Sequence, residues 1–203
     1  TPRDAQLITI YRSKDLAVIL RDLNQFSNNF IAGQLLYALG QEDSGVFSRE
    51  TALRRIAKLF SQIGIMPESY QMVDGSGLDR ANRLSVRQLS KVLVRAYQDF
   101  SIAPDLISSL SRYGHTGTLK NRDLLTQSKR RDAAAESFLS QVKADSVWGK
   151  TGTLDGVSSL AGYAVSHEDR RLVFAILING GTSKQTATEI EDGLLRVITG
   201  LKR

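Results

Sequence analysis

The chain has 203 residues, 41% hydrophobic and 24% charged, a balance that is typical of one folded globular domain and excludes a disordered chain. It contains no cysteine and only two histidines, which form no metal-binding pattern, so thiol chemistry is excluded and we expect no metal and no cofactor. The formal net charge is +6, but the basic residues are scattered and no apolar run reaches the ~18 residues of a membrane span, so we expect neither a nucleic-acid partner nor a membrane span within the chain.

The first half of the chain is predicted to be mainly helical. Residues 5–11 alternate loosely and are rich in β-forming residues, which predicts a strand before the first helix. Apolar residues then recur at helical spacing in four stretches, which are residues 16–23, 30–39, 48–60 and 85–97. The candidate caps of these helices are Ser48 and Ser85 at N-termini and Gly40 and Gly64 at C-termini. Between the last two helices, Asp74-Gly-Ser-Gly predicts a turn or loop.

The second half is predicted to end in a group of adjacent strands. Residues 121–129 are polar and predict a loop with a short helix. Residues 159–165 and 171–178 are β-rich and are joined by a polar turn, which predicts a hairpin. Thr182 or Ser183 then caps a last amphipathic helix that continues to residue 198. This order predicts an α/β fold of the α+β layered kind, with an antiparallel sheet flanked by helices.

The sequence Lys150-Thr-Gly-Thr stands where a strand is expected to begin, at the edge of this sheet. A lysine, a hydroxyl and a glycine at that place offer a fixed positive charge, a donor for a carboxylate, and room for a substrate backbone alongside Gly152. We therefore expect an anionic, extended substrate. A phosphate-binding loop is one alternative, but Ala144 stands at the first glycine of that pattern and no helix pattern follows. A plain surface turn is the other alternative.

A second motif, Ser27-Asn-Asn, lies at the junction of two predicted helices. In isolation Ser27 would be read as a helix N-cap. A Ser-x-Asn element at such a junction would instead present both outer side chains, those of Ser27 and Asn29, into a cleft. Followed by Lys-Thr-Gly in this order, it is typical of penicillin-recognising serine enzymes, which combine both elements with a Ser-x-x-Lys.

Four ordered blocks make the resemblance to one family specific, and they are residues 20–32, 73–80, 117–119 and 150–163. On these blocks the chain resembles the carboxy-terminal part of the class C low-molecular-mass penicillin-binding proteins, the penicillin-binding-protein-4 type of D-alanyl-D-alanine carboxypeptidases and endopeptidases. The resemblance implies a partial penicillin-binding or β-lactamase-like transpeptidase fold and a location in the bacterial envelope, outside the cytoplasm. It also implies as partners peptidoglycan stem peptides that end in D-Ala-D-Ala, and β-lactams in the complete enzyme.

The resemblance implies a catalytic role for three residues. Ser27 would relay a proton between the catalytic serine, the leaving amine and Lys150. Lys150 would keep the local field positive and attract the terminal carboxylate of the substrate. Asn29 would hydrogen-bond the acyl side of the substrate.

The resemblance implies substrate binding for another group. The hydroxyls of Thr151 and Thr153 would bind the terminal carboxylate, and the backbone N–H of Thr153 would form half of the oxyanion hole. Arg80 would contact the free carboxylate on a diaminopimelate side chain, since its guanidinium can donate two hydrogen bonds to one carboxylate. Two departures from the family pattern are Asn28, where many relatives have Asp, and Asp79, which would partly neutralise Arg80.

The nucleophile that this chemistry needs has no suitable place in the chain. The single Ser-x-x-Lys runs from Ser140 to Lys143, shortly before Lys150 instead of far upstream of Ser27, and we expect it on a surface helix or loop. We therefore interpret residues 1–203 as the carboxy-terminal segment of a serine DD-peptidase domain, with the nucleophile-bearing part and inserted domains absent, and we expect the isolated chain to be inactive. Two other functions stay open: a non-catalytic module that binds cell-envelope peptides, and a nucleotide-binding protein.

Overall fold

The computed structural model describes residues 4–42, 45–124 and 145–200. The first half is helical, with helices α1 (Leu16–Phe26), α2 (Asn29–Leu39), α3 (Arg49–Gln62), α4 (Val86–Gln98) and α5 (Ala103–Ser109). Short 3-10 turns occur at η1 (Pro67–Ser69) and η2 (Gly117–Leu119). The strands are β1 (Ser111–Arg112), β2 (Val147–Leu154), β3 (Val157–Val165) and β4 (Arg171–Asn179), and helix α7 (Lys184–Thr199) follows them.

The four strands form one antiparallel sheet in the order β1-β2-β3-β4. Strand β1 pairs with β2 only at Trp148 and Gly149. In the described part of the chain, the outer edge of β2 from Lys150 to Leu154 therefore has no strand beside it. On its inner side β2 pairs with β3, so that Lys150 lies opposite Ala161 and Thr153 opposite Ser158. We call residues 150–154 the open edge of β2.

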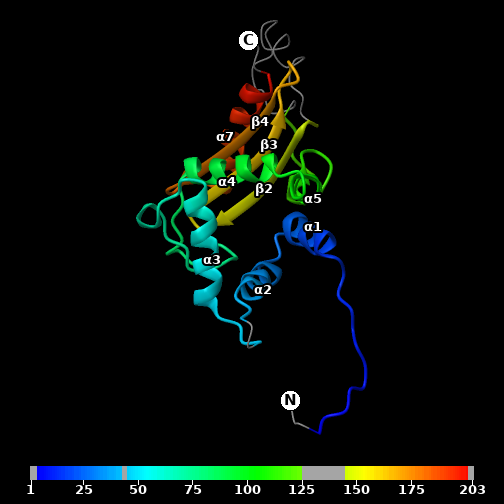
Figure 1. Ribbon diagram of the computed structural model, residues 1–203. Helices are drawn as coiled ribbons and strands as arrows, with labels where there is room; N and C mark the ends of the chain where they lie inside the picture. Colours follow the sequence, from blue (N-terminus) through cyan, green and yellow to red (C-terminus); the bar gives the residue numbers. More distant parts are fainter. Residues whose placement is uncertain (1–3, 43–44, 125–144, 201–203) are drawn as a thin grey trace, which may run out of the picture.

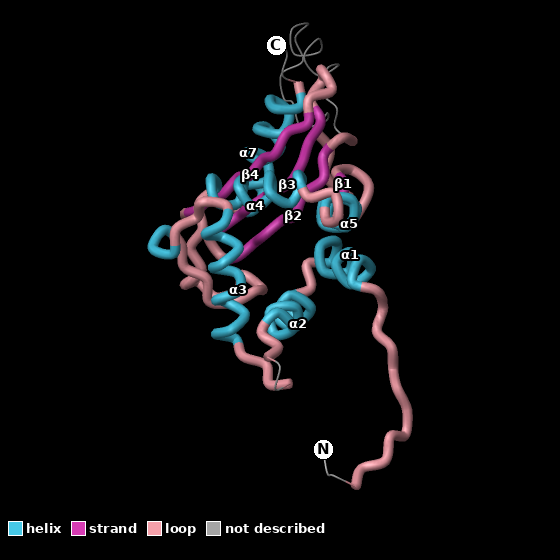
Figure 2. The backbone as a smooth tube through the Cα atoms, in the orientation of Figure 1, coloured by secondary structure: helices cyan, strands magenta, loops and turns pink. Residues whose placement is uncertain are grey.

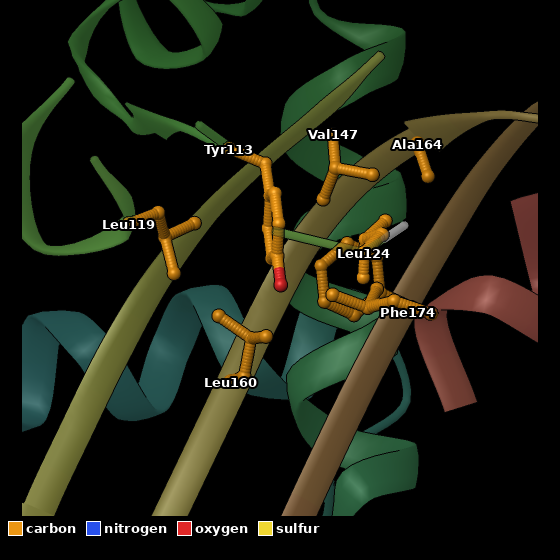
Figure 3. Close-up of a cluster of buried hydrophobic side chains, with 8 residues drawn as sticks. Tyr113, Leu119, Leu124, Val147, Leu160, Ala164 and Phe174 are labelled. Carbon is orange, nitrogen blue, oxygen red and sulfur yellow. The ribbon is translucent and has the colours of Figure 1, made fainter. Parts of the chain in front are cut away.

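Helices cover both faces of the sheet (Figure 1). Helix α4 crosses one face and contacts β4, and α7 packs against β3 on the other. The core lies mainly on the α7 side, where side chains from β2, β3, β4, α7 and residues 113–124 meet (Figure 3). These buried residues are Tyr113, Leu119, Leu124, Val147, Leu160, Ala164, Phe174 and Leu195. This is the layered fold with an antiparallel sheet that the order of elements predicted.

Helices α1 and α2 lie beyond the lower end of the sheet (Figure 2). Helix α1 contacts α5 and η2, and α2 packs on α3. The chain turns sharply between α1 and α2 because Ser27 adopts the left-handed conformation, with φ 53° and ψ 49°. The side chain of Asn28 then caps α2 by accepting a hydrogen bond from the N–H of Ile31 at 3.1 Å. The break between two helices thus places Ser27 at their junction.

The caps confirm most of the helix boundaries that the sequence predicted. Ser48 and Ser183 accept hydrogen bonds from Thr51 N–H and Thr186 N–H, and Ser85 forms a full capping box with Gln88. The hairpin of β3 and β4 is also confirmed. Helix α5 was not expected, and β2 begins at Val147, so Lys150 lies within a strand and not at its start.

The predicted strand at residues 5–11 is wrong. This segment is extended but belongs to no strand, and Leu7, Ile8 and Tyr11 are exposed. It runs away from the sheet (Figure 2). Alternating residues suit a strand, but a strand also needs a neighbouring backbone, which the described residues do not supply here. The predicted loop at 121–129 lies only partly within the described residues, of which 121–124 belong to no helix or strand.

Candidate active site

The centre of the site is a hydrogen bond between the two motifs. Lys150 Nζ donates to Ser27 Oγ at 2.7 Å, joining the open edge of β2 to the junction of α1 and α2 across 123 residues of sequence. The same ammonium donates to the carbonyl of Thr151 at 2.6 Å. Burial lowers the pKa of Lys150, because the charged form is less well solvated there. A cation and a hydroxyl are thus held in contact at the place where the sequence predicted a site.

A cavity of about 450 Å³ lies between the open edge of β2, the start of α2 and the loop at residues 75–78. Six of the seven predicted site residues line it, namely Ser27, Asn29, Lys150, Thr151, Gly152 and Thr153. Asn29 is the first residue of α2, and it reaches this wall because the preceding residue, Asn28, takes the capping role. With Asn28 in place of the Asp of many relatives, the two outer residues of the Ser-x-Asn element, Ser27 and Asn29, still line the cavity.

A second cavity, of about 380 Å³, lies on the α7 side of the same edge. Ser27, Thr151, Gly152 and Thr153 line both cavities, so the open edge of β2 stands between two hollows. A Cβ at Gly152 would meet Ser159 Oγ, so a larger residue there would require the Ser159 side chain to rotate. An extended peptide backbone could lie along this edge as an added strand, with hydroxyls on either side.

Arg80 lies at the end of β2 and does not line the cavity. Its Nη2 donates to the carbonyl of Asp155 at 2.9 Å and is 3.9 Å from the Asp155 carboxylate. Asp79 accepts a hydrogen bond from the N–H of Ala81 at 2.8 Å, so the carboxylate that pairs with Arg80 is that of Asp155. The guanidinium is exposed, next to the β2–β3 turn.

The loop before Arg80 is held by one carboxylate. Asp74 accepts hydrogen bonds from the N–H of Gly77 at 2.7 Å and of Asp79 at 3.0 Å, and from the side chains of Ser76 and Asn82. Ser76, Gly77 and Leu78 in this loop line the first cavity. The Asp-Gly-Ser-Gly loop is thus confirmed and forms the wall opposite β2.

Sequence reasoning gave no role to Thr118, which contacts the site. Thr151 Oγ1 donates to Thr118 Oγ1 at 2.8 Å, and both residues line the second cavity. The neighbouring Gly117 has a φ of +58°, and a Cβ there would lie 3.0 Å from Gln25 Cα in α1. Residues 117–119 formed one of the four blocks that carry the family resemblance, but the sequence did not indicate which residue Thr118 contacts.

Three further observations concern other predictions from the sequence. Ser140 and Lys143 lie outside the described residues, so the structure does not place them. Within the described ranges no helix combines the length and the apolar character needed to cross a membrane. Strand β2 continues through the Lys-Thr-Gly motif to Leu154. The next helix, α7, begins only 30 residues later, at Lys184. A phosphate-binding loop, in which a helix starts at the lysine, is therefore excluded.

Known proteins are similar to this chain in sequence. A D-alanyl-D-alanine carboxypeptidase from an Actinomadura species is 30% identical over 197 residues, which cover 95% of this chain and 33% of the relative. Carboxypeptidase DacB of Mycolicibacterium smegmatis is 29% identical, over 96% of this chain and 40% of the relative. The chain thus spans about a third to two fifths of these curated relatives.

Solved structures share the fold. Penicillin binding protein 4 from Haemophilus influenzae, complexed with a β-lactam, superposes with a TM-score of 0.77 at 24% identity, covering 96% of this chain and 44% of that one. A predatory endopeptidase from Bdellovibrio bacteriovorus gives a TM-score of 0.66 at 21% identity, covering 89% and 42%. Residues 1–201 match the sequence profile of one family, which confirms the resemblance drawn from the four blocks. The chain belongs to the D-Ala-D-Ala carboxypeptidase 3 (S13) family.

Proposed function

We propose that this chain is part of a serine-type D-Ala-D-Ala carboxypeptidase or endopeptidase that acts on peptidoglycan stem peptides through an acyl-enzyme. The observation that carries the proposal is the 2.7 Å hydrogen bond from Lys150 to Ser27 at the open edge of β2. It joins the Ser-x-Asn and Lys-Thr-Gly elements of penicillin-recognising enzymes in one cavity. The family and the names of the relatives support the same chemistry.

The reaction is an acyl transfer in two steps. The hydroxyl of a serine outside the described residues attacks the carbonyl carbon of the penultimate D-alanine, and the C–N bond to the last residue breaks. The proton of that hydroxyl passes to the leaving amine by way of Ser27. Water then hydrolyses the ester and restores the serine. The chain itself supplies proton relay, charge and binding, but not the attacking group.

Lys150 suits the relay because of its contacts. Its ammonium donates to one lone pair of Ser27 Oγ. The second lone pair can then accept the proton of the attacking serine while the Ser27 hydrogen points toward the leaving amine. Partial burial lowers the pKa of Lys150 and strengthens its field at the cavity. The positive charge also attracts the terminal carboxylate of the peptide, which the hydroxyls of Thr151 and Thr153 would bind.

The open edge of β2 determines the form of the substrate. An extended peptide can add to this edge through backbone hydrogen bonds, with the N–H of Thr153 donating to the oxyanion. Arg80 at the end of β2 would recognise a further carboxylate on the peptide, with its bond to the Asp155 carbonyl fixing its position. Such a substrate places the protein outside the cytoplasm, in the bacterial envelope. β-Lactams would acylate the same serine in the complete enzyme, as the β-lactam complex of the Haemophilus protein suggests by analogy.

The test compares the chain alone with the complete polypeptide that its gene encodes. We expect that the chain alone releases no D-alanine from N-acyl-D-Ala-D-Ala and gains no penicillin mass by intact mass spectrometry. The complete polypeptide should do both, and Lys150→Ala should abolish both, whereas the exposed Lys120→Ala should not. A stoichiometric penicillin adduct on the chain alone would overturn the assignment of the nucleophile and direct attention to Ser140.

A non-catalytic peptide-binding module of the same fold is the second candidate. One observation supports it, since the described residues form a cavity lined by hydroxyls and Lys150, and the proposal assigns no attacking serine among them. The two candidates differ in the residues encoded upstream of Thr1. A Ser-x-x-Lys at the start of a helix there supports the peptidase, and its absence supports the binding module.

A further inference from the structure

Arg122 forms a buried clamp between the loop after β1 and helix α7. Its Nε donates to Asp192 Oδ1 at 2.9 Å, its Nη1 donates to Glu191 Oε2 at 2.9 Å, and its Nη2 reaches Asp192 and the carbonyl of Thr188. The exposed side-chain fractions of Arg122, Glu191 and Asp192 are 12%, 2% and 0%. A guanidinium can hold two neighbouring carboxylates in this way because its donors are fixed in one plane.

The clamp extends to the open edge of β2 through Glu191. While Oε2 of this carboxylate accepts from Arg122, Oε1 accepts from Ser158 Oγ at 2.8 Å. Ser158 lies on β3 directly opposite Thr153, so the two side chains stand on the same face of the sheet as a cross-strand pair. A chain of contacts therefore runs from Arg122 to the residue that we assign to the substrate carboxylate and the oxyanion.

The same loop reaches the edge by a second contact. Thr118, four residues before Arg122, accepts a hydrogen bond from Thr151 Oγ1. Its own N–H donates to Ser111 Oγ at 3.1 Å, which holds it to β1. Clamping Arg122 to α7 thus fixes a loop whose other end holds Thr151.

We propose that Arg122 is a positioning residue for the carboxylate-binding hydroxyls of β2, acting through Glu191 and Ser158 on Thr153. This inference rests on the proposed function in that it takes Thr153 as a substrate contact. Arg122 itself is not a catalytic residue, since it acts through other side chains. Its buried carboxylate partners hold the geometry of the edge independently of substrate, so the binding wall is preorganised.

The experiment measures how well the chain distinguishes a carboxylate from an amide. The ¹⁵N-labelled 203-residue chain is titrated with N-acetyl-D-alanyl-D-alanine and, separately, with its C-terminal amide, and the Kd of each is taken from the amide signals. The ratio of the two values is insensitive to any unfolded fraction, because that fraction weakens both equally. The variants are Ser158→Ala, Glu191→Gln, their double variant and Arg122→Lys. Glu189→Gln, an exposed position on the same helix, is the matched control.

We expect Ser158→Ala and Glu191→Gln each to reduce the preference for the carboxylate by about two- to tenfold, the range expected for one hydrogen bond. The double variant should lose no more than one single variant, since both break the same path. Arg122→Lys should lose as much, because lysine cannot hold both carboxylates. If Arg122→Lys does not fold, the Ser158 and Glu191 variants still decide the question.

Three outcomes would overturn the inference or separate it from the proposed function. An unchanged ratio in Ser158→Ala and Glu191→Gln, or strictly additive losses, would overturn the positioning path. Equal weakening of both ligands would show a merely structural role. If the wild-type chain itself does not prefer the carboxylate, the assignment of Thr151 and Thr153 in the proposed function fails. In that case the inference stands only if Glu191→Gln and Arg122→Lys still move the Thr153 amide signal and Glu189→Gln does not.

Discussion

Gly117 in the loop after β1 packs directly against Gln25 in α1, so closely that a Cβ on the glycine would lie 3.0 Å from the Gln25 Cα and backbone oxygen. Its φ of +58° also lies in the left-handed region that favours glycine. This contact joins the pair of helices that carries Ser27 to the loop that carries Thr118. The relative position of the two walls of the site depends on it.

Gly117→Ala is therefore expected to destabilise the chain more than backbone strain alone would. The left-handed conformation costs alanine ~1–2 kcal/mol, and the collisions of its Cβ with Ser111 Oγ and with the Gln25 backbone of α1 add a similar amount, for a total of about 2–4 kcal/mol. Gly45→Ala is the control, because Gly45 has a φ of +77° with nothing within 4 Å of its Cβ position. Urea denaturation measures both. Equal losses in the two variants would contradict the role of the contact.

Ser27 allows its conformation and its hydroxyl to be tested separately. Ser27→Ala and Ser27→Gly both lose the hydrogen bond from Lys150, so Ser27→Ala should lower the free energy of unfolding by about 1 kcal/mol. In Ser27→Gly the relief of the left-handed strain at φ 53° should offset this loss, so its free energy of unfolding should be unchanged or higher. Both remove the hydroxyl, so in the complete polypeptide both should slow acylation by penicillin by about 100-fold or more. Full acylation by Ser27→Gly would show that the serine has only a conformational role.

The fold was predictable where local rules sufficed. Serine caps and apolar spacing located α1 to α4 and α7, because these signals act within one helix. The segment at 5–11 shows the limit of such rules. Its alternation suited a strand, but pairing depends on a distant backbone that no local pattern reveals. Helix α5 was missed since seven residues carry too little periodicity.

The site, like the fold, was predictable from the sequence only in part. The Lys150 and Ser27 motifs could be paired because their order matched a known family, and the structure brings them together. The clamp could not be predicted. Arg122 lies in a polar stretch that predicted a loop with a short helix. Its carboxylate partners are about 70 positions away, on a helix whose apolar face gave the main signal. A buried ion pair leaves no periodic trace in a sequence.

Asp74 makes the loop at residues 74–79 sensitive to acid. Burial alone would raise the pKa of this carboxyl, but its hydrogen bonds, led by that from Asn82, outweigh burial and lower the pKa from 3.8. Because the folded state binds the proton less well than the unfolded state, this stabilisation is present above pH 3.8 and is lost as the pH falls through the folded-state pKa. The difference in unfolding free energy between wild type and Asp74→Asn should therefore shrink below pH 3.8. Urea denaturation of wild type and Asp74→Asn from pH 3 to 7 measures this trend, and a difference that stays constant or grows below pH 3.8 would contradict it.

Lys150 gives a pH dependence of the same sign at the basic end of the range. Burial lowers its pKa below 10.5, so the folded state releases this proton at a lower pH than the unfolded state does. Stability then rises with pH between the folded-state pKa and 10.5, because in that window the unfolded state binds more protons. The stability of wild type relative to Lys150→Met should thus increase as the pH approaches 10.5. Urea denaturation from pH 7 to 10 checks this, with Lys120→Met as the exposed control, and a difference that is flat or falls would contradict the burial of the charge.

Arg122→Met should be among the most destabilising single changes near the site. It leaves the carboxylates of Glu191 and Asp192 buried without their cation, and removal of one partner from a buried ion pair costs about 3–5 kcal/mol. Adding Asp192→Asn to Arg122→Met should recover part of this loss, since it removes the carboxylate that is fully buried. The exposed pair of Arg95 and Asp99 is the comparison, and Arg95→Met should cost less than about 1 kcal/mol. Urea denaturation of wild type, Arg122→Met, Asp192→Asn and the double variant gives the coupling, and a double variant less stable than Arg122→Met would show that the buried charge is not the source of the loss.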